Sequence, residues 1–243
     1  MYGDKDFIHR HHFTDYSSTQ ILKLVFNDFP NIKSVIDVGC GVGTWLHTAK
    51  ELGAEQIMGI EGQWLDIEKF AKVSPEQIKR SDLNQPIPIQ SQFDLLISLE
   101  VAEHLTPERA EHFIEELCSL APLILFSGAV PGQRDKTHQN EQWPSYWAEK
   151  FSNHGFKAYD AIRWRIWNDT NIPYWYRQNP IVYAHESLEL PKHIQQTETQ
   201  SPAAVVHPDF MAVREDISFG QTLKMMGHTL KKSAVKRMNR VRH

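Results

Sequence analysis

The sequence predicts an α/β fold with a doubly wound, mostly parallel seven-stranded sheet. Short apolar runs alternate with segments whose apolar residues recur at helical spacing, which favours parallel strands joined by helices. The run at 34–38 enters a glycine cluster at 39–43, as a buried strand does before a tight turn into a helix. Two later runs, at 156–163 and 181–185, are expected to close the sheet as a pair, with the last strand antiparallel.

The other elements follow from the same patterns. An amphipathic helix over 17–29 ends at Pro30 and forms an N-terminal helical cap. Thr106 and Pro107 suit the N-cap and first position of a helix that runs to about residue 119. Further strands are expected at 56–60, 77–79, 93–99 and 122–127, and further helices at 44–52, 65–71 and 143–152.

Composition divides the 243 residues into three regions. Residues 1–188 are expected to form one α/β domain, and the polar, proline-bearing residues 189–216 a linker. Residues 217–243 are expected to form a basic amphipathic helix, because they hold seven Lys or Arg and no acidic residue. Subtracting these seven charges from the net charge of −4 leaves −11 for the rest of the chain.

An acidic body with a basic tail predicts that residues 217–243 meet an anionic membrane surface or an acidic protein. A solvated helix, or one that rests on the protein's own acidic surface, fits the same pattern. Two cysteines, no apolar run of 18 residues and no signal-peptide pattern predict a cytoplasmic protein. The tail adds the expectation of peripheral attachment at the inner membrane surface.

The segment 37–43, Asp-Val-Gly-Cys-Gly-Val-Gly, indicates a nucleotide-containing cofactor. A side chain at Gly39 or Gly41 would prevent a ligand from approaching the backbone. Glu61 is the next acidic residue that ends a predicted strand, and its separation of 22 residues from Gly39 fits a ribose-binding carboxylate.

Two positions narrow the choice of cofactor. Thr44 stands where the dinucleotide fingerprint needs Gly or Ala, and Asp37 would repel a pyrophosphate but attract a cation. Over about residues 15–185 the sequence resembles the class I S-adenosylmethionine (SAM)-dependent methyltransferases, whose cofactor is a sulfonium. The resemblance places Asp82 and Leu83 near the adenine, and the strand at 93–98 with the following segment 100–105 beside the transferred methyl group. The full set of SAM-binding residues that it implies is Asp37, Gly39, Cys40, Gly41, Gly43, Thr44, Trp45, Glu61, Gly62, Asp82, Leu83 and Leu99.

Glu100, Glu103 and His104 follow the predicted strand at positions i, i+3 and i+4, which one helical turn would bring to one face. Two carboxylates and an imidazole can hold Mg²⁺ or Mn²⁺, and the cation would lower the pKa of a substrate hydroxyl. The same spacing also fits His104 as a metal-free general base, or a polar turn without a chemical role.

This Glu-x-x-Glu-His segment resembles the metal-binding segment of quinone O-methyltransferases and of small-RNA 2′-O-methyltransferases. The resemblance implies that a histidine from a later loop completes the site. His138 is the candidate here, although the residues around it differ from that motif. The implied metal ligands are Glu100, Glu103, His104 and His138, and the implied catalytic residues are Glu103, His104 and His138.

The segments 128–147 and 164–179 combine aromatic rings with amides and resemble bacterial methyltransferases of polysaccharide and natural-product pathways. Such side chains suit a sugar, although aromatic residues at helical spacing also serve as core. We therefore expect a SAM-dependent O-methyltransferase acting on a sugar hydroxyl of a glycan or glycosylated metabolite. An RNA 2′-O-methyltransferase and a non-catalytic SAM-binding partner protein are the alternatives. The acidic body argues against nucleic acid.

Overall fold

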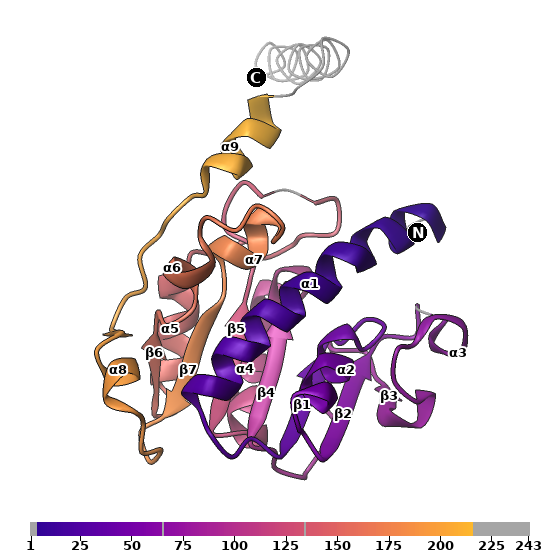
Figure 1. Ribbon diagram of the computed structural model, residues 1–243, viewed down its shortest axis with the longest axis horizontal. Coiled ribbons are helices and arrows are strands. Elements are labelled where there is room, and N and C mark those ends of the chain that lie inside the picture. The colour runs from indigo at the N-terminus through magenta and orange to yellow at the C-terminus, as the bar shows by residue number, and fades with distance from the viewer. Residues whose placement is uncertain (1–3, 65, 134, 216–243) are drawn as a thin grey trace, which may run out of the picture. The chain divides into compact units, whose positions relative to one another are not determined.

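The computed structural model describes residues 4–64, 66–133 and 135–215. Their strands form one sheet in the order β3-β2-β1-β4-β5-β7-β6-β8 (Figure 1). The first five strands in that order are parallel, and β7 is antiparallel to both of its neighbours, β5 and β6. The strands are β1 (Ser34–Val38), β2 (Gln56–Glu61), β3 (Ile78–Arg80), β4 (Leu95–Leu99), β5 (Leu123–Ser127), β6 (Phe156–Tyr159), β7 (Ile181–His185) and β8 (Glu198–Thr199). The predicted fold class is confirmed, and the two-residue strand β8 adds an edge to the seven expected strands.

The helices follow the strands as the periodicity indicates. Thr106 precedes a 3₁₀ turn, Pro107–Arg109, which continues into α4. The first helix begins at Asp4 and is therefore longer than the predicted 17–29. The helices are α1 (Asp4–Asp28), α2 (Thr44–Glu51), α3 (Ile67–Phe70), α4 (Ala110–Leu120), α5 (Pro144–Ser152), α6 (Arg163–Ile166), α7 (Tyr174–Gln178), α8 (Lys192–Gln195) and α9 (Pro208–Glu215).

Two apolar cores lie on opposite faces of the sheet, because alternate residues of each strand point to opposite sides. On one face, Leu22 of α1 and Leu46 of α2 pack with Val35, Leu95 and Leu125 of the strands. Figure 1 shows α1 running across this face. On the other face, α4 and α5 contribute Phe113, Leu117, Trp147 and Phe151 against Ile36, Leu96, Ile124 and Tyr183. Helices on both faces leave the carboxyl ends of the parallel strands as the edge where a ligand binds.

The predicted linker 189–216 is wrong for its first part. Residues up to Val205 belong to the same compact unit as the sheet, and they include α8 and β8. Arg163, whose side chain is fully buried, donates from Nη1 to the Ala203 carbonyl at 3.0 Å. The polar composition of this segment hid its long-range contacts, which a linear pattern does not record.

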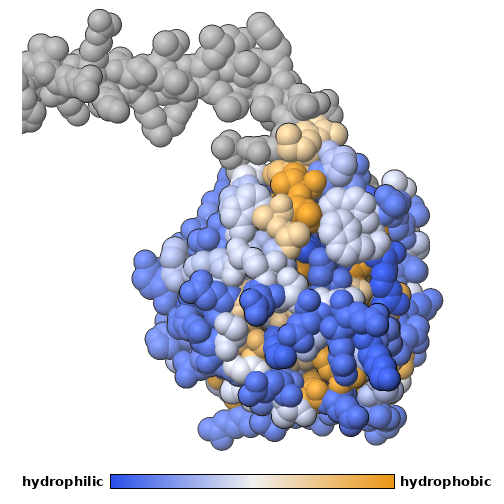
Figure 2. Space-filling model, turned by 90° about the vertical axis from the view of Figure 1, so that its left-hand side faces the viewer, coloured by the Kyte–Doolittle hydropathy of each residue, from blue (hydrophilic) through white to orange (hydrophobic). Residues whose placement is uncertain are grey.

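The second unit begins at Val206, and its described part contains α9. The predicted helix at 217–243 lies outside the described residues. No described helix is both long and apolar enough to cross a membrane. The face drawn in Figure 2 is covered mainly by hydrophilic side chains.

Candidate active site

The three glycines of the loop between β1 and α2 differ in the space that surrounds them. Gly39, Gly41 and Gly43 all have positive φ angles, of 85°, 55° and 79°. A Cβ at Gly39 would lie 2.4 Å from Val101 Cγ2, and one at Gly43 would lie 2.8 Å from Val73 Cγ2. A Cβ at Gly41 would meet no described atom within 4 Å. Gly39 and Gly43 therefore permit close packing, and Gly41 is the position where the backbone stays open to a ligand.

Asp37, near the end of β1, is a buried carboxyl that forms no ion pair with the described residues. It is 2% exposed, and its Oδ2 has no hydrogen-bond partner among the described residues. Burial, and then the charge of Glu61, raises the pKa of Asp37 well above its usual range. A cationic ligand is the kind of group that would compensate this carboxylate, and the ammonium and sulfonium of SAM fit that requirement.

Glu61 ends β2 beside the glycine loop. Its Oε2 accepts from the Gly41 amide at 2.6 Å, and its Oε1 accepts from the Gly62 amide at 2.7 Å and from Trp64 Nε1 at 2.9 Å. Burial raises the pKa of Glu61, although these three donors oppose the shift. Beyond it, a hollow of about 440 Å³ is lined by Gln63, Trp64, Asp66 and Arg80.

The other predicted cofactor residues lie in the glycine loop, at the start of α2, after β3 and at the end of β4. Cys40, Thr44 and Leu99 are buried. Ser81, which precedes Asp82, donates its amide to the Glu61 carbonyl at 2.9 Å, so the segment after β3 begins beside β2. The Leu83 carbonyl accepts from Arg109 Nε at 3.1 Å, which fixes this segment to the 3₁₀ turn before α4.

Sequence reasoning missed Trp64 as a neighbour of Glu61, and it did not place Tyr176 of the predicted acceptor segment 164–179 beside Trp45. Trp64 is 66% exposed, and the only sequence signal for it is its position three residues after Glu61. Tyr176 of α7 packs edge-on against Trp45 of α2, with ring centroids 5.4 Å apart. The pairing joins elements more than a hundred residues apart, which no local pattern indicates.

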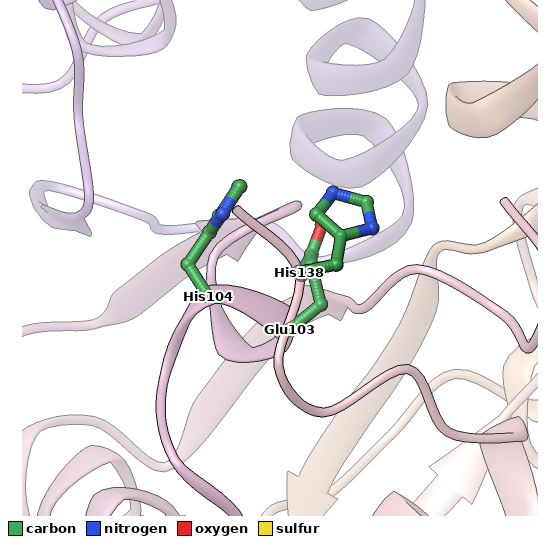
Figure 3. Close-up of side chains that lie close together, drawn as sticks. All are labelled: Glu103, His104 and His138. Carbon is green, nitrogen blue, oxygen red and sulfur yellow. The ribbon is translucent and has the colours of Figure 1, made fainter. Parts of the chain in front are cut away.

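A second cluster lies after β4, where Glu103, His104 and His138 come together (Figure 3). One carboxylate oxygen and one nitrogen from each imidazole all lie within 4.8 Å of one another. Glu103 is 1% exposed, and its Oε2 has no hydrogen-bond partner among the described residues. Burial, and then the charge of Glu100, raises the pKa of Glu103 well above its usual range. A cation is the kind of group that would compensate this carboxylate.

Hydrogen bonds orient both imidazoles in the same way. Thr137 Oγ1 donates to Asp135 Oδ1 at 2.7 Å, so it accepts from His104 Nδ1 at 3.0 Å. His138 Nδ1 lies 2.8 Å from Glu141 Oε1 and donates to it. With both Nδ1 atoms protonated, each neutral ring presents a bare Nε2, the form that binds a metal or accepts a proton. Burial, and then His138, lowers the pKa of His104, which favours its neutral form.

The predicted single helical turn that joins Glu100 to this cluster is wrong. Glu100 has a φ of +58°, and the 3₁₀ turn begins only at Ala102. The left-handed residue interrupts the helical geometry on which the i, i+3, i+4 spacing depends. Among the described residues, Glu103, His104 and His138 form the candidate metal group, and Glu100 is not a member of it.

The aromatic residues of the predicted acceptor segments, 128–147 and 164–179, differ in how deeply they are buried. Trp147 is 2% exposed and packs on Phe126, so it belongs to the core. Burial, and then the charges of Glu100 and Glu141, raises the pKa of Tyr174 to about 12. Tyr174 therefore lies in the field of the carboxylates near the cluster. Trp164 is 54% exposed and lies against Trp167, with ring centroids 5.1 Å apart.

Comparison with known proteins identifies the class. A family model described as a methyltransferase domain matches residues 9–168, and the chain belongs to that family. Together with the sheet order and the glycine loop, this match makes the protein a member of the class I SAM-dependent methyltransferases, with SAM as its cofactor.

Individual relatives are distant. The ribosomal protein L11 methyltransferase of Thermotoga petrophila is 23% identical over 142 residues, which are 55% of this chain and 47% of that protein. The mitochondrial ubiquinone biosynthesis O-methyltransferase of Dictyostelium discoideum is 31% identical over 102 residues, 36% of this chain and 31% of that one. The chain thus spans less than half the length of these curated relatives. SAM-bound CalS10, an amino pentose methyltransferase from Micromonospora echinaspora, shares the fold with a TM-score of 0.55 at 12% identity, covering 76% of this chain and 98% of its own.

Proposed function

We propose that this domain transfers the methyl group of SAM to a sugar hydroxyl of a glycan or glycosylated metabolite, with a divalent cation at Glu103, His104 and His138. The observation that carries the proposal is the convergence of one carboxylate oxygen and one nitrogen from each imidazole within 4.8 Å, at a glutamate whose buried Oε2 has no hydrogen-bond partner among the described residues. The cluster follows β4, at the strand edge that carries the cofactor residues. One carboxylate and two imidazoles can hold Mn²⁺, Fe²⁺ or Zn²⁺, and they suit Mg²⁺ less well because Mg²⁺ prefers oxygen ligands.

The residues around the ligands support a metal role. Ligating histidines commonly donate their other N–H to a carboxylate or another acceptor, as His138 does to Glu141 and His104 does to Thr137. A bound cation would lower the pKa of the acceptor hydroxyl and neutralise its developing charge. Without a cation, His104 Nε2 is the candidate base, and Thr137 and Asp135 would stabilise the imidazolium.

The reaction is an in-line displacement. The acceptor oxygen would give its proton to His104 Nε2 or to water and form a bond to the methyl carbon, while the carbon–sulfur bond of SAM would break and S-adenosylhomocysteine would leave. The task of the protein is to align these three atoms and to supply the ionised oxygen.

Two further points favour an oxygen of a sugar as acceptor. A ubiquinone biosynthesis O-methyltransferase is among the relatives, and the fold is one that an amino pentose methyltransferase also uses. The described site is rich in carboxylates, amides and tyrosines. The net charge of −11 over residues 1–216 disfavours RNA as an acceptor.

Labelled SAM tests the proposal directly. Purified protein is incubated with methyl-labelled SAM and separate pools of glycosides, nucleotide sugars and RNA, and mass spectrometry locates the label. We expect label on a sugar oxygen, activity lost in EDTA and restored by Mn²⁺, and a loss of at least about a hundredfold in Glu103→Gln. His112→Ala, at an exposed histidine, is the matched control. Full activity in EDTA rejects the metal, and label on nitrogen or carbon rejects O-methylation.

A further inference from the structure

We infer that Glu100 is not a ligand of the metal group but the residue that positions the loop carrying His138. This inference rests on the proposed metal role, and it departs from the four-ligand pattern that the sequence resemblance implies. The two carboxylates of the Glu-x-x-Glu-His segment have opposite surroundings. Glu103 Oε2 is buried without a described partner, whereas both oxygens of Glu100 accept hydrogen bonds.

The donors to Glu100 come from three separate segments. Ser127 Oγ at the end of β5 donates to Oε1 at 2.8 Å, and Asn179 Nδ2 before β7 donates to the same oxygen at 2.9 Å. Gln133 Nε2 of the loop after β5 donates to Oε2 at 2.7 Å. The carboxylate therefore ties the end of β4 to three neighbouring segments.

The surrounding amides are themselves held in place. Asn179 Nδ2 also donates to Gln133 Oε1 at 3.0 Å, and Gln178 Nε2 donates to Asn179 Oδ1 at 2.9 Å. The side-chain amides of Gln133 and Asn179 can keep these orientations because both carboxylate oxygens of Glu100 accept hydrogen bonds. A Glu100→Gln substitution keeps the volume but turns an –NH₂ toward donors on one side, so it breaks at least one of these bonds.

Two attachments of the loop between β5 and α5 flank His138, in addition to the bonds of the Gly132 amide to Glu141 Oε2 at 2.7 Å and of Thr137 Oγ1 to His104 Nδ1. Gln133 bonds to Glu100, and the amides of Gln139 and Asn140 donate to the Glu103 carbonyl at 2.7 and 3.0 Å. Thr137 and His138 lie between these two attachments. Releasing the first attachment frees one side of the segment that delivers the His138 imidazole to Glu103 and His104.

The left-handed backbone at Glu100 allows this arrangement. Its φ is +58°, and its amide is bonded to Ser127, at 3.2 Å from the carbonyl oxygen and 3.0 Å from Oγ. Such a conformation is uncommon for a residue other than glycine and persists where the surroundings fix it. Here it separates the Glu100 carboxylate from the turn that holds Glu103 and His104.

Mn²⁺ binding to the full-length protein tests whether Glu100 positions the loop or binds the metal itself. Calorimetry gives the affinity, and pulsed electron paramagnetic resonance counts the histidine nitrogens coupled to Mn²⁺. We expect two coupled histidines in the wild type and one in His138→Ala. Glu100→Gln and Gln133→Leu should each weaken binding by about tenfold, the scale of one lost charged hydrogen bond, and lose the same coupling as His138→Ala. The double variant should be no weaker than either single variant.

Three results would overturn the inference: additive losses in the double variant, two retained couplings in Glu100→Gln, or unchanged binding in Gln133→Leu. The matched control is Gln195→Leu, because Gln195 of α8 also donates one side-chain hydrogen bond, to the Leu190 carbonyl.

Absence of Mn²⁺ binding by the wild type would reject the metal proposal alone. The anchor is then judged in the metal-free protein by hydrogen exchange at the amides of residues 138–140. Exchange should rise in Glu100→Gln and Gln133→Leu but not in Gln195→Leu, and unchanged protection rejects the anchor.

Discussion

The raised pKa of Asp37 predicts how SAM binding depends on pH. Because burial and Glu61 raise its pKa, the cofactor-free protein holds a proton on this carboxyl at pH values where an ordinary aspartate is ionised. A cation favours the ionised form and lowers the pKa again. SAM binding should therefore release a proton, and the affinity should rise with pH until the pH exceeds the raised pKa.

Calorimetry of SAM binding in two buffers with different ionisation enthalpies measures this proton release. Asp37→Asn should release fewer protons, show a flatter pH dependence and bind SAM about 10- to 100-fold more weakly, as expected for a lost hydrogen bond to a charged group. Equal proton release in the wild type and the variant would contradict this assignment and would point to Glu61, whose pKa is also raised.

The loop glycines give a second prediction at the residue scale. Gly39→Ala places a Cβ 2.4 Å from Val101 and should destabilise the fold by about 2–5 kcal/mol. Gly41→Ala meets no described atom within 4 Å, so it should cost only about 1 kcal/mol while weakening SAM binding by about tenfold or more. Denaturant unfolding and calorimetry separate the two effects. Equal stability of the variants would count against this division of roles.

At the scale of elements, a buried guanidinium holds the segment after β7 against the body of the domain. Arg163 of α6 forms two hydrogen bonds with the Asp160 carboxylate, at 2.8 and 2.6 Å, and donates to the carbonyls of Gln178 and Ala203. These contacts join α6, α7 and the segment before α9. The polar composition of 189–205 reads as a linker because it does not show that a distant arginine fixes it.

Arg163→Met should lower the free energy of unfolding by about 3–5 kcal/mol, because it leaves the Asp160 carboxylate without its ion-pair partner, with only the Trp164 Nε1 hydrogen bond at 2.9 Å. Lys157→Met is the matched control, since the Lys157–Glu198 ion pair between β6 and β8 is half-exposed and solvent-screened. Urea unfolding of both variants provides the measurement. A small effect of Arg163→Met would show that apolar packing alone holds the segment.

At the scale of the whole molecule, residues 217–243 differ in net charge from residues 1–216. Residues 217–243 carry seven basic side chains and no acidic one, against −11 for residues 1–216. We predict that full-length protein binds anionic phosphatidylserine vesicles and that binding falls as salt rises, because screening weakens the attraction. Removing residues 217–243 should abolish binding without changing SAM affinity. Equal vesicle binding by both forms in a flotation assay would reject a membrane role for the tail.

Local sequence patterns were sufficient to predict the sheet and the cofactor of this protein. The alternation of short apolar runs and helical segments in the sequence predicted the sheet. The cofactor was predicted from the sequence of Asp37, the glycine loop Gly39–Gly43 and Glu61. These signals lie within single strands and turns, where neighbouring residues determine backbone geometry and burial. The family match supports the same assignment.

Only the tertiary structure decided which polar groups meet. It placed His138 beside Glu103 and His104, bound Glu100 to Ser127, Gln133 and Asn179, and moved Trp147 into the core. These contacts join segments tens of residues apart, and their geometry depends on the packing of several strands and on a left-handed backbone at Glu100. A spacing of i, i+3 and i+4 has meaning only within a continuous helix, and one residue with a positive φ was enough to separate the two glutamates.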